Sequence, residues 1–306
     1  GILTPVNRSE MTSWREYGEM GKDFESRSNR DTESNYGTGR FRAIFEPDTL
    51  SRFGAEVSYS AQTSDGDSWS RTSLTSGSVP MESLGDYRQV EDYKTYSATV
   101  NYSRDLVGRA ASLKAIVDYV GKRSNGDNDY RIRQEQEDGS RDTLYRSHAS
   151  ADYDLVMADL SFHKNTGKRW SYQFGAKYTY TSMDDYSLYE GLSKEGFWLP
   201  NDDYGCLLRY HEHIAGAYAS FSAELGSWNL STGVRTEYAA TVNRDGALER
   251  DYLDLFPNVG VTYAFDPLKR RLLTGQYARN IERPPFYALN PNRRQSSDYS
   301  YQIGNP

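Results

Sequence analysis

One segment of the chain, WSYQFGAKYTYT at residues 170–181, alternates between two kinds of side chain. Tyr172, Phe174, Ala176, Tyr178 and Tyr180 share one parity, whereas Gln, Gly, Lys and Thr occupy the positions between them. Successive side chains of a β-strand point to opposite faces of a sheet. The segment therefore predicts a strand with one apolar, largely aromatic face and one polar face.

The same two-residue period recurs in segments that begin near Ala55, Tyr96, Leu113, Trp228 and Val259. In none of them does the apolar parity carry a charge, whereas the other parity carries Glu56, Lys114, Asp118, Lys177, Arg235 and Glu237. We predict strands at 36–46, 52–63, 93–103, 109–122, 149–162, 169–183, 210–223, 228–240, 253–265 and 270–282. The polar residues 1–35 predict a loop with one weaker strand.

The connections between these strands alternate in length. Short turn-like links lie at 46–52, 103–109, 163–169, 224–227 and 266–271. Long polar stretches, interpreted as loops, lie at about 63–92, 122–148, 184–209, 241–252 and from 283 onward. Short turns on one side and long loops on the other are typical of an up-and-down barrel in an outer membrane. The predicted fold class is all-β, an antiparallel up-and-down transmembrane β-barrel.

Composition is compatible with such a barrel. The mean hydropathy of -0.82 averages an apolar face with a polar face and polar loops. The 26 tyrosines suit a boundary between water and hydrocarbon. A barrel strand needs about 9–11 residues to cross the hydrocarbon layer, which the run from Tyr172 to Tyr180 supplies. The alternative is an antiparallel sheet with one face on a soluble core, which explains the loop asymmetry and the tyrosines poorly.

Three stretches in the last third of the chain are more specific than this pattern. They are GVRTEY at 233–238, DLFPNVGVTYAFD at 254–266, and YARNIERPPFYALNPNRRQSSDYSYQIGNP at 277–306. They resemble the barrel of TonB-dependent outer-membrane receptors, in particular the outer-membrane β-barrel family of Bacteroidetes. The residues that match the family motif are Arg279, Arg283, Pro284, Asn290, Pro291, Gly304, Asn305 and Pro306. The clear resemblance covers about residues 209–306.

The resemblance implies a transport function. Receptors of this kind take up a scarce extracellular nutrient through a barrel of 22 strands, which is closed by an N-terminal plug that contacts the TonB complex. Residues 1–306 are then one barrel segment of about 10–11 strands, without the plug domain or the C-terminal closing strands. The implied location is the outer membrane of a Gram-negative bacterium, and outer-membrane lipid is an implied partner.

Candidate ligand-binding residues are aromatic and basic side chains in the long stretches. They are Trp69, Phe197, Trp198, Tyr204 and Arg209. Binding function in such scaffolds is carried by loops. Trp198 and Tyr204 are equally compatible with an aromatic girdle at the membrane surface.

Metal binding has only weak candidates. His211 and His213 lie at i, i+2 on one strand face, but no third ligand follows with metal spacing. Asp-rich stretches at 64–69, 125–130 and 201–204 lack the closing Glu of a twelve-residue calcium loop, so turn chemistry explains them as well. We therefore expect no resident metal and no cofactor.

Several function classes are disfavoured. A net charge of -7 without a basic stripe argues against nucleic acid as a partner. No grouping of a nucleophile with a base is visible, so we do not expect an enzyme. An outer-membrane protease or lipase and a non-membrane β-sheet binding protein remain the alternatives to a transporter.

Overall fold

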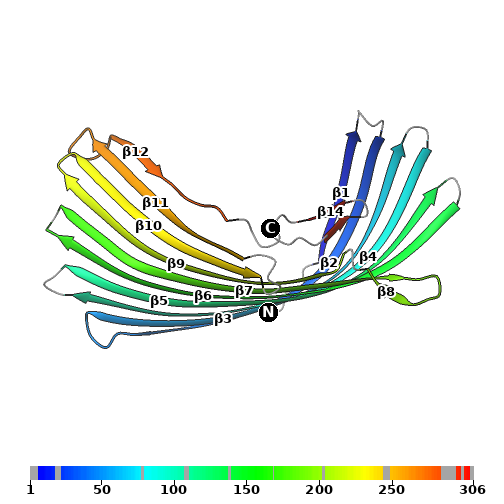
Figure 1. Ribbon diagram of the computed structural model, residues 1–306, viewed down its shortest axis with the longest axis horizontal. Coiled ribbons are helices and arrows are strands. Elements are labelled where there is room, and N and C mark those ends of the chain that lie inside the picture. Colours follow the sequence, from blue (N-terminus) through cyan, green and yellow to red (C-terminus); the bar gives the residue numbers. More distant parts are fainter. Residues whose placement is uncertain are drawn as a thin grey trace.

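The computed structural model describes residues 6–17, 22–76, 79–106, 110–136, 139–167, 169–201, 204–243, 249–283, 294–297 and 300–303. Almost all of them lie in strands (Figure 1). The strands are β1 (Val6–Tyr17), β2 (Lys22–Phe45), β3 (Ser51–Ser76), β4 (Val79–Leu106), β5 (Ala111–Gln136), β6 (Gly139–Thr166), β7 (Trp170–Leu192), β8 (Trp198–Pro200), β9 (Cys206–Leu225), β10 (Trp228–Asn243), β11 (Glu249–Ala264), β12 (Leu272–Ala278), β13 (Arg294–Ser297) and β14 (Ser300–Gln302).

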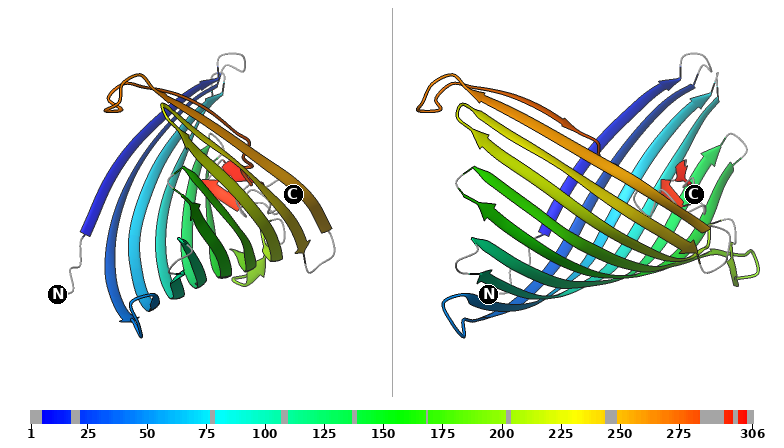
Figure 2. Two further views of the ribbon diagram at one scale, coloured as in Figure 1. Left: turned by 90° about the vertical axis from the view of Figure 1, so that its left-hand side faces the viewer. Right: turned by 60° about the vertical axis from the view of Figure 1, so that its left-hand side comes forward.

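One antiparallel sheet of 12 strands contains all of these elements except the β13–β14 pair. Its strands follow chain order from β1 to β12, with the short β8 paired to β7 outside the main path. The sheet curves into an open trough whose two edges, β1 and β12, do not pair with each other (Figures 1 and 2). This confirms the all-β, up-and-down prediction and gives the partial barrel that the sequence predicts.

The register places the two parities of each strand on separate faces. In β7, Phe174 pairs with Phe162 of β6 and with Ala219 of β9, and the ladder continues without a shift. The chain after β12 crosses the concave side of the trough (Figure 1), and Arg283 on it contacts Glu237. The polar parity therefore forms the concave face, and the apolar parity forms the convex face.

Large apolar side chains on the convex face are open to the surroundings. Val100 is 58% exposed and Phe174 is 48% exposed, although each lies in the middle of a regular strand. Water would make this arrangement unfavourable by about 25 cal/mol for each Å² of apolar area. Hydrocarbon around the convex face removes that cost.

The short links form tight turns at one end of the trough, which we name the short-turn end. The Asp48 carboxylate accepts hydrogen bonds from the N–H groups of Leu50 and Ser51, each at 2.7 Å. Asp266 accepts the N–H of Arg270 at 2.6 Å in the same way. Gly226 has φ +64°, which glycine adopts without steric cost. Local side-chain chemistry thus accounts for these turns.

The prediction of long loops is wrong for two stretches at the opposite end, which we name the extended end. The stretches 63–92 and 122–148 are almost entirely strand, and β3 to β6 are each 26 to 28 residues long. Within residues 1–35, where the sequence predicts a loop with one weaker strand, the described residues form two strands, β1 and the first part of β2. The stretch 184–209 does contain a longer irregular connection, around β8, and parts of 241–252 and of the chain from 283 onward lie outside the described residues.

The physical reason is that these extensions have water on both faces. Neither face of the extensions then needs a row of apolar side chains. The hydrogen bonds between neighbouring strands still satisfy the backbone N–H and C=O groups. Polar pairs join the strands instead, such as Ser34 to Ser64 at 3.0 Å and Arg133 to Asp142 at 2.8 Å. Within the described residues, no helix is long and apolar enough to cross a membrane.

Candidate functional site

A cluster of charged and aromatic side chains, the inner cluster, lies on the concave face where β10 and β11 meet the chain after β12. Glu237 on β10 is ion-paired with Arg235 at 2.9 Å and with Arg283 at 2.8 Å. The Nε of Arg283 also donates a hydrogen bond to the Tyr252 hydroxyl at 2.9 Å. Glu237 is largely buried, with 14% of its side chain exposed, because both guanidinium groups cover it.

The inner cluster continues along β11. Arg279 donates to the Asp254 carboxylate at 3.2 Å and to the Leu255 carbonyl at 3.1 Å. The guanidinium carbons of Arg235 and Arg279 lie 4.8 Å and 5.8 Å from the ring centroid of the buried Phe256. Two arginines of the motif at 277–306 thus hold the segment after β12 against the concave face.

The other motif residues cannot be placed in this way. Pro284, Asn290, Pro291, Gly304, Asn305 and Pro306 lie outside the described residues. Beside the inner cluster is a pocket of about 500 Å³ on the same face, which Lys177, Arg235, Glu237 and Arg283 help to line. Its surroundings are polar and charged, as expected for a water-filled interior.

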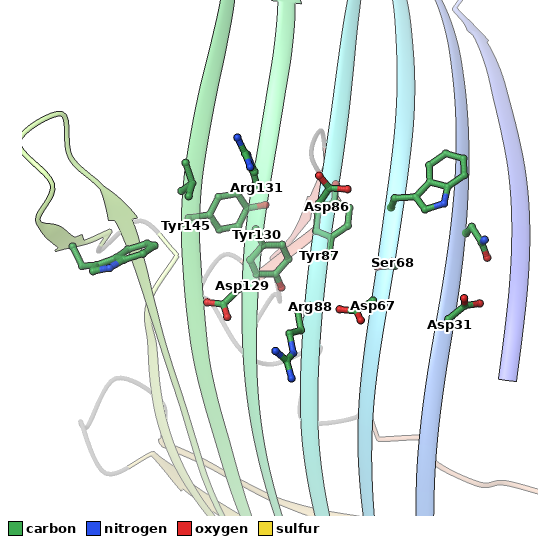
Figure 3. A pocket seen from close by; sticks show the side chains of 14 residues that line it. Asp31, Asp67, Ser68, Asp86, Tyr87, Arg88, Asp129, Tyr130, Arg131 and Tyr145 are labelled. Atoms are coloured by element: carbon green, nitrogen blue, oxygen red, sulfur yellow. The ribbon is translucent and has the colours of Figure 1, made fainter. Parts of the chain in front are cut away.

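A second pocket, the outer pocket, has a volume of about 610 Å³ and lies at the extended end (Figure 3). Strand register brings its charged residues into one transverse row: Asp31 pairs with Asp67, Asp67 with Arg88, and Arg88 with Asp129. These residues have the same parity as the convex face nearer the short-turn end. They come from four strands that are far apart in sequence.

Two of the predicted ligand-binding residues line the outer pocket. Trp69 on β3 pairs with Asp86 of β4, in the row next to Asp67 and Arg88. Trp198 lies on β8, which the β7 pairing brings toward the same region, and the Arg146 guanidinium lies 4.6 Å from its ring centroid. Figure 3 shows the aromatic and charged side chains arranged across neighbouring strands.

Three tyrosines that the sequence analysis did not single out border the outer pocket on the same strands, but their parity is opposite to that of Asp67 and Arg88, so their rings lie on the concave face. Tyr87, Tyr130 and Tyr145 occupy paired positions on β4, β5 and β6. Tyr130 stacks on Tyr145 at 4.4 Å between ring centroids, and Tyr87 meets Tyr130 edge-on at 5.5 Å. Only the strand register brings these three tyrosines together, because each is separated from the next along the chain by at least fifteen residues. The sequence alone therefore does not predict the group.

Ion pairs fix the charge state of the outer pocket. A hydrogen bond from the Arg8 guanidinium lowers the pKa of the Asp31 carboxyl below its ordinary value. The hydrogen bond from Arg88 to Asp65, together with nearby carboxylates, raises the pKa of Arg88. Both groups are therefore ionised at neutral pH, and the pocket offers acidic and basic groups side by side.

The remaining predicted ligand-binding residues do not line the outer pocket. Phe197 is 68% exposed, and its N–H donates to the Ser193 hydroxyl at 3.2 Å. The Tyr204 ring lies 5.9 Å from the Tyr189 ring, and Arg209 approaches Asp184 at 3.9 Å. A role for these three in ligand binding stays a prediction.

The two histidines lie on the convex face. Hydrogen bonds of 2.8 Å and 3.1 Å join His213 to the Tyr178 hydroxyl and His211 to the Tyr180 hydroxyl through their Nδ1 atoms. Within the described part of the chain, no group of three or more His, Cys, Asp or Glu side chains could hold a metal ion. The pair fits an interfacial band of amphipathic side chains better than a metal centre.

An open up-and-down sheet, apolar on its convex face and charged on its concave face, defines the class of β-barrel membrane proteins. The model of the outer membrane protein beta-barrel family matches residues 108–306, which is most of the chain. The chain belongs to that family. It is an outer-membrane protein of Gram-negative bacteria, and membrane lipid surrounds the apolar part of its convex face.

Solved structures give weak matches. The translocator domain of the autotransporter NalP from Neisseria meningitidis is 13% identical over 91% of this chain and 82% of its own, with a TM-score of 0.29. The ferric preacinetobactin receptor BauA from Acinetobacter baumannii is 12% identical over 86% of this chain and 46% of its own, with a TM-score of 0.41. No curated protein matches the sequence significantly.

Proposed function

We propose that this chain forms part of a TonB-dependent receptor of the Bacteroidetes type, which takes up a scarce extracellular nutrient. The observation that carries the proposal is the inner cluster. Arg279 and Arg283, from the segment that resembles such receptors, hold that segment against the concave face through Asp254 and Glu237.

The charged concave face supports the same role. Lys177, Arg235 and Glu237 surround a polar pocket, and a plug domain needs polar partners on the wall it contacts. In the complete protein, further strands would close the barrel to about 22, the number found in plugged transporters. The protein moves its substrate without covalent chemistry, and the TonB complex supplies the energy.

In outer-membrane barrels the short turns face the periplasm. The extended end then projects outside the cell and meets the nutrient first. The strands there are long enough to carry binding residues well beyond the lipid, as Trp69 and Arg88 illustrate.

The test uses the intact protein in its native outer membrane. A photo-crosslinking residue at position 177 should form an intramolecular link to a plug domain. Deletion of this gene and deletion of TonB should each give the same growth defect under nutrient limitation. A strain that lacks both should grow no worse than either single deletion strain. Crosslinks to lipid alone, or a growth defect that persists independently of TonB, would contradict the proposal.

A further inference from the structure

The outer pocket lies beyond the lipid-facing part of the convex face. On β4 that part ends near Tyr96, whose ring stacks with Tyr59 of β3 at 6.1 Å. Arg88 lies eight residues further along the same strand, which is roughly 26 Å at about 3.3 Å per residue. The pocket is therefore open to the medium outside the membrane and is separate from the concave face.

The polar groups of the outer pocket include acceptors that the protein itself leaves unused. Within the described residues, the carboxylates of Asp67, Asp86 and Asp129 form no hydrogen bond and no ion pair within 4.0 Å, although Asp67 and Asp129 interact electrostatically with Arg88. The guanidinium groups of Arg88 and Arg131, bound at one side to Asp65 and Asp142, add N–H donors to the same lining. Donors and acceptors are thus interleaved over a short distance.

The aromatic groups supply flat apolar surface beside these polar groups. Trp69 is 48% exposed, so a large part of its indole is open to a ligand. Trp198 is kept in place by Arg146, which is itself ion-paired with Glu190 at 2.7 Å. The volume of about 610 Å³ lies within the roughly 300–1,000 Å³ common for small-ligand sites.

The combination excludes several ligand classes. Within the described residues no group of three or more His, Cys, Asp or Glu side chains could hold a metal ion, and a phosphate would be repelled by the carboxylates of Asp67, Asp86 and Asp129. A purely apolar ligand would leave those carboxylates without water or a partner. A hydroxyl group both donates and accepts hydrogen bonds, so a dense set of hydroxyls satisfies interleaved carboxylates and guanidinium groups.

We propose that the outer pocket binds a saccharide. Asp67, Asp86 and Asp129 accept hydrogen bonds from sugar hydroxyls, and Arg88 and Arg131 donate to sugar oxygens. The indole of Trp69 covers the apolar C–H face of a sugar ring. This capture site is on the outside of the barrel wall and does not depend on the transport proposed above.

The experiment is isothermal titration of the intact protein in phospholipid nanodiscs with neutral tetra- to hexasaccharides of glucose, mannose and galactose. Binding to at least one of these probes is expected. Trp69→Ala should weaken it about tenfold, the size expected for one aromatic contact. Asp86→Asn, which keeps the shape but removes the charged acceptor, should also weaken it.

Controls separate this site from the rest of the molecule. Trp14→Ala removes a tryptophan that is even more exposed than Trp69, at 75% against 48%, and that lies on β1 outside the pocket, so it should leave binding unchanged. Glu237→Gln in the inner cluster should also leave it unchanged, so that loss of transport does not imply loss of saccharide binding. Both variants and wild type must show the same heat-modified gel mobility as a check on folding.

A second measurement, the amount of glycolipid that copurifies with the protein, distinguishes outer-leaflet glycolipid from free glycans as the source of the saccharide. If the pocket takes sugars of outer-leaflet glycolipid, the glycolipid that copurifies with the protein should fall in the Trp69→Ala variant and not in Trp14→Ala. If it takes free glycans, only the titration should respond. No binding to any probe together with unchanged glycolipid, or equal effects of Trp69→Ala and Trp14→Ala, would overturn the proposal.

Discussion

Arg283 and Glu237, 46 positions apart in sequence, are joined by a 2.8 Å ion pair on the concave face. Glu237 is the shared acceptor of two arginines, since Arg235 reaches it as well. Removal of the carboxylate leaves two guanidinium groups without their main partner. The contact therefore decides how firmly the segment after β12 is attached to the barrel wall.

Glu237→Gln should lower the free energy of unfolding of the intact protein by on the order of 1–3 kcal/mol, because a largely buried charge-assisted pair is lost. Urea unfolding in detergent measures this change. Arg270→Ala is the control, because its side chain is 73% exposed and its pair with Asp266 is peripheral. Equal stabilities of the two variants would contradict the structural role of Glu237.

An added positive charge should lower the free energy of folding gained in a membrane much more on the convex face than on the concave face. Ala176→Arg puts a cation on the convex face near the centre of the lipid layer and should cost about 2–4 kcal/mol in folding into vesicles. Gln173→Arg places the same cation on the concave face of the same strand, beside a polar pocket, and should cost far less. Similar costs for the two variants would show that both faces meet the same solvent.

Close packing of strands makes one glycine hard to replace. A Cβ at Gly175 would lie 2.5 Å from the Leu160 carbonyl oxygen and 2.5 Å from the Tyr218 hydroxyl, so Gly175→Ala should destabilise the barrel by about 1–3 kcal/mol. Gly37→Ala is the matched control, because nothing lies within 4 Å of its added carbon. Thermal unfolding of both variants checks the difference, and equal melting temperatures would argue against this packing.

The extended end should keep its ion pairs in acid. Hydrogen bonds from Arg133 and Arg131 lower the pKa of Asp142 from 3.8 to about 2. A depressed carboxyl pKa stabilises the fold at pH above the ordinary value, and this contribution is lost only as the pH falls through about 2. Carboxyl-carbon NMR, with the Asp142→Asn variant for assignment, measures the midpoint. A midpoint at or above 3.8 would mean that the hydrogen bonds from Arg133 and Arg131 to Asp142 are absent in solution.

The strands near the short-turn end were predictable because a lipid-facing surface forces strict alternation. The predicted segment 169–183 begins one residue before β7 and otherwise falls within it, and 228–240 falls within β10. The strand extensions were not predictable in this way, because sequences with water on both faces need no apolar period. Residues 63–92 therefore resemble a loop although they form parts of β3 and β4.

The candidate sites were predictable only as isolated residues. Trp69 and Trp198 could be named as ligand-binding candidates from their type, but 129 positions separate them in the sequence. The cross-strand pairs that unite Asp67 with Arg88, and Arg88 with Asp129, exist only in the register. For the same reason the partners of Arg279 and Arg283 could not be assigned before the β10–β11–β12 pairing was known.

The central claim is that alternate side chains of these strands meet hydrocarbon on one face and water on the other. Spin labels at positions 98, 115 and 174 of the intact protein in lipid bilayers test it most directly, with positions 99, 114 and 177 as neighbours of opposite parity. Labels at positions 98, 115 and 174 should be highly accessible to oxygen and poorly accessible to a water-soluble nickel reagent, and labels at 99, 114 and 177 should show the reverse. An aqueous environment at positions 98, 115 and 174 would contradict the claim.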